Sequence, residues 1–366
     1  MLVTALLFIA VLFVLILVHE WGHYITAKKT RMRVDEFGIG FPPKVWSFRR
    51  GETEYSLNAF PIGGFVRIFG EDPTALKDDD PDKNRSFVAR PRWAQAVVLV
   101  AGVVMNVLLA WVLFWFVFMI GVPTAVTEAE AGPDATLRVI TVASEGPLHT
   151  VLPSNATITS VSTAGATLEQ LTPSKLGEFV AAAGEQEITI TYQMGSQPEQ
   201  TVNVVPEIGV IPDEPERLAI GVSSVLIEEK RNDPITALRG ATEQTWGVLQ
   251  LIVVSLAGLL YNSVTGQADF SQVAGPVGIF NLVGDTASIG LTSLLMFIAS
   301  ISLSLAVINL FPIPALDGGR LVFVAIEAII RRPIDPIWTA RLNLLGFVLL
   351  IALMIAVTYN DILRLI

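Results

Sequence analysis

The 366-residue chain contains no cysteine and only three histidines, His19, His23 and His149. The absence of cysteine excludes disulfides, thiolate metal ligands and thiol nucleophiles. Charged residues are also scarce, at 16%, against roughly 25% in an ordinary soluble domain. Hydrophobic residues make up 52% of the chain, and the formal net charge is −10. This composition excludes an ordinary soluble protein, a disordered chain and a nucleic-acid binder, whose surface is normally basic.

Long apolar runs predict membrane-spanning helices. A bilayer core of about 30 Å requires about 20 apolar residues in a helix. Four segments fit this requirement: 1–27, 94–120, 291–311 and 343–360. The first does not resemble a secretory signal peptide, because it lacks a basic n-region and a small-residue cleavage site. A fifth stretch, 246–261, is short for a span and is equally consistent with a re-entrant or surface-lying helix.

The distribution of charge predicts the orientation of these helices. Residues 28–92 hold 13 of the 24 Lys and Arg, whereas residues 121–245 hold 6 basic and 17 acidic residues. Loops rich in Lys and Arg favour the cytoplasmic side, and the loop 312–342 also carries four arginines. Four spans with both termini extracytoplasmic satisfy these assignments. A fifth span at 246–261 would place the last arginine-bearing loop outside. We therefore predict a polytopic α-helical membrane protein with four transmembrane helices.

The segment 126–226 differs from the rest of the chain, because its polar, Gly and Pro content rises and short β-like runs appear. These runs are 137–142, 157–161, 187–192, 201–205 and 219–225, and a helix is predicted over 173–183 with Ser174 as its N-cap. The pattern predicts a small inserted β-rich domain. Such a domain is either a passive extracellular spacer or a module that accepts a peptide strand at an open sheet edge.

The loop 28–93 contains an unusually apolar β-hairpin signal. Two alternating runs, Glu54–Phe60 and Phe65–Phe69, flank Gly63-Gly64, which predicts a turn between two paired strands. The hairpin is either a small cytoplasmic cap or a membrane-dipping element beside the catalytic site. In the second case its exposed edge could pair with a substrate chain.

The strongest chemical signal is His19-Glu20-Trp21-Gly22-His23, an HExxH sequence at the end of the first apolar run. Positions i and i+4 share one helix face, so both imidazoles can reach one metal ion, and Glu20 lies close enough to take a proton from the attacking water. Two nitrogens and a carboxylate suit zinc with one position open. Ionisable residues at membrane depth are costly and usually functional.

A catalytic zinc requires a third protein ligand. The only other histidine, His149, lies in the segment 126–226, on the opposite side of the membrane. The third ligand should therefore be a carboxylate at the cytoplasmic end of another span. Asp317, in the segment 309–319 (NLFPIPALDGG), fits that position. Pro312 and Pro314 break the helix there. The alternative role for Asp317 is an N-cap for a helix over 320–330.

With these motifs the chain resembles the site-2 protease family of intramembrane zinc metalloproteases, and within it the bacterial regulator-of-sigma-E protease branch. HEWGH and NLFPIPALDGG match the two catalytic signatures of that family. Residues 61–71 (PIGGFVRIFGE) resemble its membrane re-entrant β-loop, and residues 275–279 (GPVGI) resemble a segment ahead of its third span. The resemblance covers nearly all of the chain outside 126–226.

The resemblance implies a role for each of these residues. His19, His23 and Asp317 would bind one Zn²⁺ per chain, and Glu20 would be the general base. Further residues would contact the substrate: Asn309, Asn106 and the β-loop residues Gly63, Gly64 and Phe65. Residues 126–226 would form a single PDZ domain, and residues 227–290 a membrane-surface helical region. The location implied is a bacterial cytoplasmic membrane, with the active site near the cytoplasmic face.

The function predicted is therefore a zinc metalloendopeptidase that cleaves single-pass transmembrane substrates, such as anti-sigma factors or remnant signal peptides. Membrane lipid and a peptide ligand of the PDZ-like domain are further expected partners, and nucleic acid is not. Two alternatives belong to other classes. A membrane metal transporter normally needs ligands along a path, whereas those found here cluster at one face. A non-catalytic PDZ-bearing scaffold would not require a general base, so the presence of Glu20 within an intact HExxH argues against it.

Overall fold

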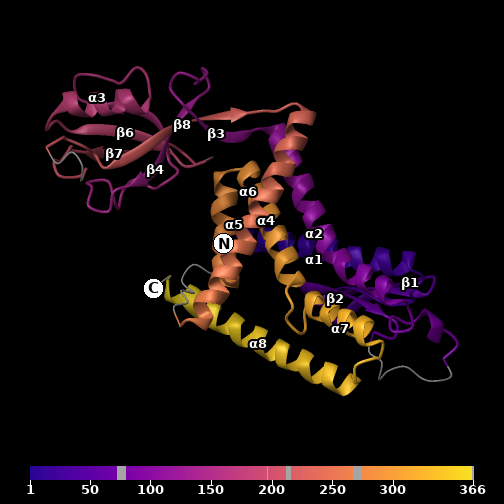
Figure 1. Ribbon diagram of the computed structural model, residues 1–366. Helices are drawn as coiled ribbons and strands as arrows, with labels where there is room; N and C mark the ends of the chain where they lie inside the picture. The colour runs from indigo at the N-terminus through magenta and orange to yellow at the C-terminus, as the bar shows by residue number, and fades with distance from the viewer. Residues whose placement is uncertain (72–79, 196, 212–215, 267–273, 365–366) are drawn as a thin grey trace. The chain divides into compact units, whose positions relative to one another are not determined.

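The computed structural model describes residues 1–71, 80–195, 197–211, 216–266 and 274–364. It contains two compact units (Figure 1). The membrane unit comprises Met1–Trp115, Leu238–Gly284 and Leu295–Ile366. The β-rich unit comprises Phe116–Ala237 and Asp285–Leu294.

The chain is a polytopic membrane protein. Its longer helices are α1 (Leu2–Lys29), α2 (Arg92–Ile120), α4 (Pro234–Val264), α5 (Pro276–Ile289), α6 (Leu291–Leu310), α7 (Asp317–Ile330) and α8 (Pro336–Leu363). Within the described residues, α1, α2, α4, α6 and α8 are long and apolar enough to cross a membrane. The four predicted spans correspond to α1, α2, α6 and α8, and α4 is the least apolar of the five. Helix α8 begins before the predicted position 343, because the Asp335 carboxylate accepts the Ile337 N–H and caps the helix start.

The loop between α1 and α2 forms a small sheet from β1 (Val34–Arg50) and β2 (Thr53–Ile68), followed by the 3₁₀ helix η2 (Lys83–Arg85). Segment 34–39 of β1 pairs with 64–68 on one side and with 54–57 on the other. Further along β1, Phe41 pairs with Phe60, and segment 44–50 pairs with 53–58. The predicted hairpin is therefore wrong in its pairing, because the two runs that flank Gly63-Gly64 are separated by 34–39.

Glycine–aromatic packing explains this order of strands. A Cβ atom on Gly38 would collide with the ring of Phe65, and one on Gly63 would collide with the ring of Phe41. Each ring therefore covers a glycine on a neighbouring segment and fixes the register, as aromatic side chains do opposite glycine in sheets. The outer edge of 64–68 has no strand partner among the residues described here.

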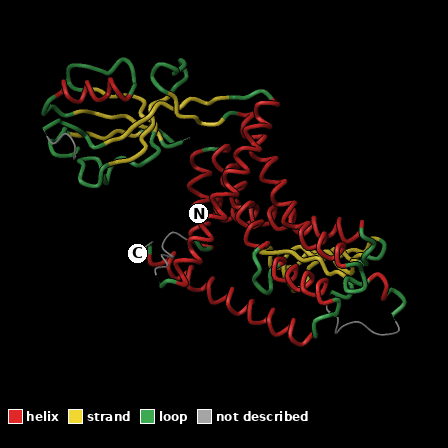
Figure 2. The backbone as a smooth tube through the Cα atoms, in the orientation of Figure 1, coloured by secondary structure: helices red, strands yellow, loops and turns green. Residues whose placement is uncertain are grey.

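The β-rich unit contains β3 (Val122–Val126), β4 (Thr136–Val142), β5 (Thr157–Ser162), β6 (Ile188–Gln193), β7 (Gln200–Val204) and β8 (Val222–Lys230). They form one sheet in the order β3-β8-β4-β5-β6-β7, drawn in yellow in Figure 2. Alternate residues of β6, Ile188, Ile190 and Tyr192, are buried in the core, as period-two strands require. The β-rich character predicted for 126–226 is thus confirmed.

Helix α3 (Pro173–Ala183) lies in this unit and matches the predicted range. Its N-cap is Thr172, whose side chain accepts the Lys175 N–H at 3.3 Å. The prediction of Ser174 as the cap is wrong, because Pro173 takes the first helical position, where its missing N–H has no cost.

Helix α8 packs closely against the loop that follows α6. The Asn343 side-chain oxygen accepts the Ala315 N–H at 3.2 Å. One turn further on, a Cβ atom on Gly346 would overlap the Pro314 carbonyl oxygen. Only glycine at this position allows α8 to approach the loop so closely, and the loop leads directly into Asp317.

We predict that Gly346→Ala destabilises the membrane unit by about 1–3 kcal/mol, the usual cost of overpacking a close contact. The measurement is the thermal unfolding midpoint of the full chain in detergent micelles. Gly258→Ala on α4 is the matched control, because a Cβ atom there meets no atom within 4 Å. Equal midpoints for the two variants would show that the contact does not constrain α8.

Candidate metal centre

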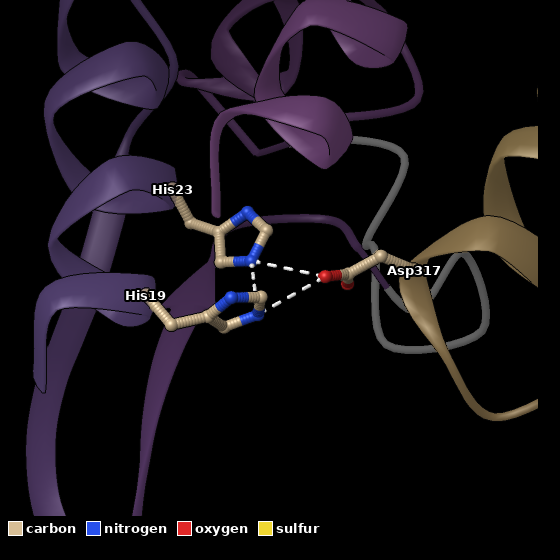
Figure 3. A group of neighbouring side chains, drawn as sticks. All are labelled: His19, His23 and Asp317. Atoms are coloured by element: carbon tan, nitrogen blue, oxygen red, sulfur yellow. Dashed lines mark hydrogen bonds and ion pairs between the residues drawn. The ribbon is translucent and has the colours of Figure 1, made fainter. Parts of the chain in front are cut away.

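Three side chains from two separate parts of the chain converge on one point. His19 and His23 lie one turn apart on α1, and Asp317 is the first residue of α7 (Figure 3). The Nε2 atoms of the two imidazoles lie 3.1 Å apart, and they lie 3.1 and 3.3 Å from the Asp317 Oδ2 atom. This is the cluster within the described residues whose donor atoms could hold a metal ion.

The hydrogen bonds around the cluster favour a cation at its centre. The His23 Nδ1 atom lies 2.9 Å from the Val98 carbonyl oxygen, to which it can only donate. The Nε2 atom of a neutral His23 therefore presents a lone pair toward Asp317. Burial acts to raise the pKa of the Asp317 carboxyl, but the two adjacent imidazoles lower that pKa below its ordinary value. The carboxylate is therefore ionised, and it requires a cation beside it, either a bound metal ion or a proton on an imidazole.

The spacing of these atoms fits zinc. Tetrahedral zinc with bonds of about 2.0 Å holds its ligands about 3.3 Å apart. The three separations in the cluster, 3.1, 3.1 and 3.3 Å, are close to that value. Three protein ligands leave a fourth position for water, which is the arrangement of a catalytic zinc site.

The loop before α7 holds Asp317 in place. Pro312 and Pro314 prevent a continuous helix, and Ala315 has a positive φ of 80°. Cβ atoms on Gly318 and Gly319 would overlap the carbonyl oxygens of Leu310, Phe311 and Ile313, so the loop can fold over the helix start only with glycine at both positions. Leu316, not Asp317, is the N-cap of α7, and it makes no side-chain capping bond. The Asp317 side chain is turned to the histidines instead.

The other predicted site residues lie at different distances from this cluster. Asn106 on α2 is fully buried, and its amide Nδ2 lies 3.4 Å from His19 Nδ1. A Cβ atom on Gly64 would lie 3.3 Å from Glu20 Cγ, which places the 64–68 strand against the HExxH turn. The Phe65 ring is packed over the sheet. Asn309 is half-buried in the last turn of α6, and no hydrogen bond joins it to the cluster among the described residues.

Two contributors were not found from the sequence. The Val98 carbonyl is a backbone group, and no residue type signals its role. Gly102 of α2 faces both imidazoles, since a Cβ atom there would overlap His23 Nε2 and lie 2.6 Å from His19 Cε1. A glycine inside an otherwise apolar helix often marks such a close approach, and this signal could have identified it.

We predict that Gly102→Ala weakens zinc binding on the order of tenfold or more, because the new methyl group displaces the ring atoms that face Asp317. Zinc affinity is measured by competition with a chelator. Gly247→Ala on α4, where a Cβ atom meets nothing within 4 Å, should bind zinc like the unmodified chain. Unchanged affinity in Gly102→Ala would mean that the metal does not lie at this cluster.

Comparison with known proteins identifies the family. The model of peptidase family M50 matches residues 7–353. The chain is 30% identical to zinc metalloprotease RasP of Oceanobacillus iheyensis and 28% identical to the regulator of sigma-W protease RasP of Bacillus subtilis, over 99% of each chain. It is 30% identical to zinc metalloprotease RasP of Bacillus licheniformis, again over 99% of both. With two imidazoles and a carboxylate spaced for zinc, the chain belongs to peptidase family M50, the site-2 protease family, and is a zinc metalloendopeptidase of the membrane.

Proposed function

We propose that this protease hydrolyses peptide bonds within or near the transmembrane helix of single-pass substrates. His19, His23 and Asp317 would hold one zinc ion, which lowers the pKa of a bound water to about 7 and polarises a carbonyl. The observation that carries the proposal is the convergence of their three donor atoms within 3.3 Å at the end of an apolar helix. Glu20, between the two histidines, accepts the proton of the attacking water and returns it to the leaving amine.

Substrate binding would use the open strand edge at 64–68. A transmembrane helix hides its carbonyls in its own hydrogen bonds, so it must unwind before hydrolysis. An extended segment can then replace those bonds by pairing with the backbone of Gly64 and Phe65. The proximity of Gly64 to Glu20 supports this arrangement, because a paired segment would pass beside the general base. Asn309 would contact the substrate backbone.

Four membrane crossings agree with the directions of the helices in the membrane unit. Val98 contacts His23 and Asn106 contacts His19, so α2 runs antiparallel to α1. Helices α1 and α6 both run toward the cluster, whereas α2 runs away from it. The end of α2 and the start of α6 therefore lie on the same side of the membrane, and the chain between them crosses the membrane an even number of times. Helix α5, with 14 residues, is about 21 Å long and too short to cross alone. We propose that α4 and α5 enter and leave on one side.

The β-rich domain would be a single PDZ domain that binds an extended peptide. On one side of β8, β4 pairs with 222–227, whereas on the other side β3 pairs only with 226–230. On that side no described strand pairs with 222–225, and this edge lies with Leu176 and Val180 of α3 along a groove of about 420 Å³. A peptide strand could add to this edge. The domain would also act as a filter that admits only substrates already trimmed outside.

The proposed location is a bacterial cytoplasmic membrane, with both termini outside and the zinc near the cytoplasmic face. The basic residues of 28–92 support this orientation. One relative is named for regulation of sigma-W, which supports a role in regulated intramembrane proteolysis. Anti-sigma factors and remnant signal peptides would be the substrates.

We predict that Glu20→Gln reduces cleavage of a single-pass substrate by about 10²–10⁴-fold, the usual contribution of a general base, and leaves zinc content unchanged. The unmodified chain and Glu20→Gln are each reconstituted with a labelled substrate, and the zinc content is measured on the same samples. The exposed carboxylate of Glu145 provides the control, and Glu145→Gln should cleave normally. If Glu20→Gln cleaved at the normal rate, the assigned mechanism would be wrong. Zinc uptake into the vesicles would point to a transporter.

Deletion of 126–226 should permit cleavage of untrimmed substrates, because the filter is removed. The measurement compares cleavage of one substrate with and without its extracytoplasmic domain. Adding Glu20→Gln to the deleted chain should abolish the activity gained, which attributes it to this protease. If the untrimmed substrate stays resistant, the domain does not act as a filter.

A further inference from the structure

Asn106 makes an incomplete set of hydrogen bonds beside the metal cluster. Its side chain is 0% exposed, and its Oδ1 atom has no hydrogen-bond partner. Its Nδ2 atom lies 3.4 Å from His19 Nδ1. An unpaired buried carbonyl oxygen costs about 1–3 kcal/mol, so a native protein seldom retains one without a purpose.

The protonation of His19 in a zinc site explains the arrangement. His19 Nε2 faces Asp317 Oδ2 and His23 Nε2, each at 3.1 Å, so it must present a lone pair to a bound cation. The proton of a neutral His19 then lies on Nδ1, where it requires an acceptor. Half a turn of the Asn106 amide exchanges its nitrogen and oxygen without changing its shape. This rotation brings the unpaired Oδ1 atom to the Nδ1 proton.

His23 is already held in the equivalent way. Its Nδ1 atom donates to the Val98 carbonyl oxygen at 2.9 Å. Val98 and Asn106 both lie on α2, on the side that faces α1. Carbonyl oxygens of one helix would thus orient both imidazoles, one from the backbone and one from a side chain. Such partners fix the tautomer and the ring orientation of a metal-binding histidine.

A second contact fixes Asn106 itself. The buried Ser302 hydroxyl of α6 donates to the Asn106 main-chain carbonyl at 2.8 Å. Helix α6 continues into the loop that carries Asp317. Asn106 therefore lies where the helix that orients the histidines is bonded to the helix that delivers the carboxylate.

We propose that Asn106 is a positioning residue for zinc, whose side-chain oxygen accepts a hydrogen bond from His19 Nδ1 and holds the imidazole for metal binding. This inference rests on the proposed ligand set. It replaces the expectation that Asn106 contacts substrate, because the side chain is fully buried and directed at His19.

The test measures metal binding in the full detergent-solubilised chain. Zinc is removed, and the affinity for added Zn²⁺ is determined by chelator competition. Asn106→Leu removes the acceptor at similar volume and should weaken zinc binding about 10–100-fold. Asn106→Asp keeps an acceptor oxygen at the same position and should retain affinity within a few-fold. The absorption bands of added Co²⁺ should shift in Asn106→Leu and not in Asn106→Asp.

Val103→Ala is the packing control. It shortens a buried side chain on the same helix and contains no hydrogen-bonding group. It should lower the unfolding midpoint and leave both zinc affinity and the Co²⁺ spectrum unchanged. If Val103→Ala weakens zinc binding as much as Asn106→Leu does, the effect comes from packing and the proposal fails.

Two further outcomes would contradict the proposal. If Asn106→Leu binds zinc normally but shows a raised KM for a peptide substrate, Asn106 contacts substrate. Equal weakening in Asn106→Asp and Asn106→Leu would exclude the acceptor role. His19→Ala tests the underlying ligand set separately, because undiminished zinc affinity in that variant would overturn the proposed function as well.

Discussion

The mutual approach of two imidazole nitrogens and one carboxylate oxygen is the constraint on which the membrane unit depends. Nitrogen and oxygen lone pairs repel one another at 3.1–3.3 Å unless a cation, either a metal ion or a proton, lies between them. The directions of three helices follow from this requirement. Helices α1 and α6 must bring His19, His23 and Asp317 to one point, and α2 must run antiparallel to α1 so that its Val98 carbonyl contacts His23.

Close backbone approach is the means by which this assembly is achieved. Apolar side chains gain little by leaving lipid for another apolar helix, so membrane helices associate where small residues permit contact. Gly102 lets α2 reach the imidazoles, Gly318 and Gly319 let the loop fold over the start of α7, and Gly346 lets α8 support that loop. Each of these glycines lies where a methyl group would displace a side chain of the metal cluster or the chain segment that carries it.

The sequence predicts what depends on local patterns and misses what depends on long-range pairing. Apolar runs predict α1, α2, α6 and α8, and the spacing of His19 and His23 predicts a shared helix face. Topology and charge place Asp317 with them. The insertion of 34–39 between two segments of β2 is not predictable in this way, because register is fixed by rings covering distant glycines. The Val98 carbonyl has no side-chain signal, and the resemblance supplies the position of Asn106 without its partner.

The position of the open strand edge connects the fold to substrate choice. On the proposed mechanism, a helix gives up its internal hydrogen bonds before its carbonyl reaches zinc, and the edge at 64–68 replaces some of those bonds. Because Gly64 lies near Glu20, the residues that pair with the edge would be those next to the bond that is cut. Pairing through the backbone does not discriminate between the side chains of substrates. Substrate selection should therefore depend on how easily a substrate helix unwinds. Gly, Pro and β-branched residues, which weaken helices, should therefore favour cleavage more than any particular sequence.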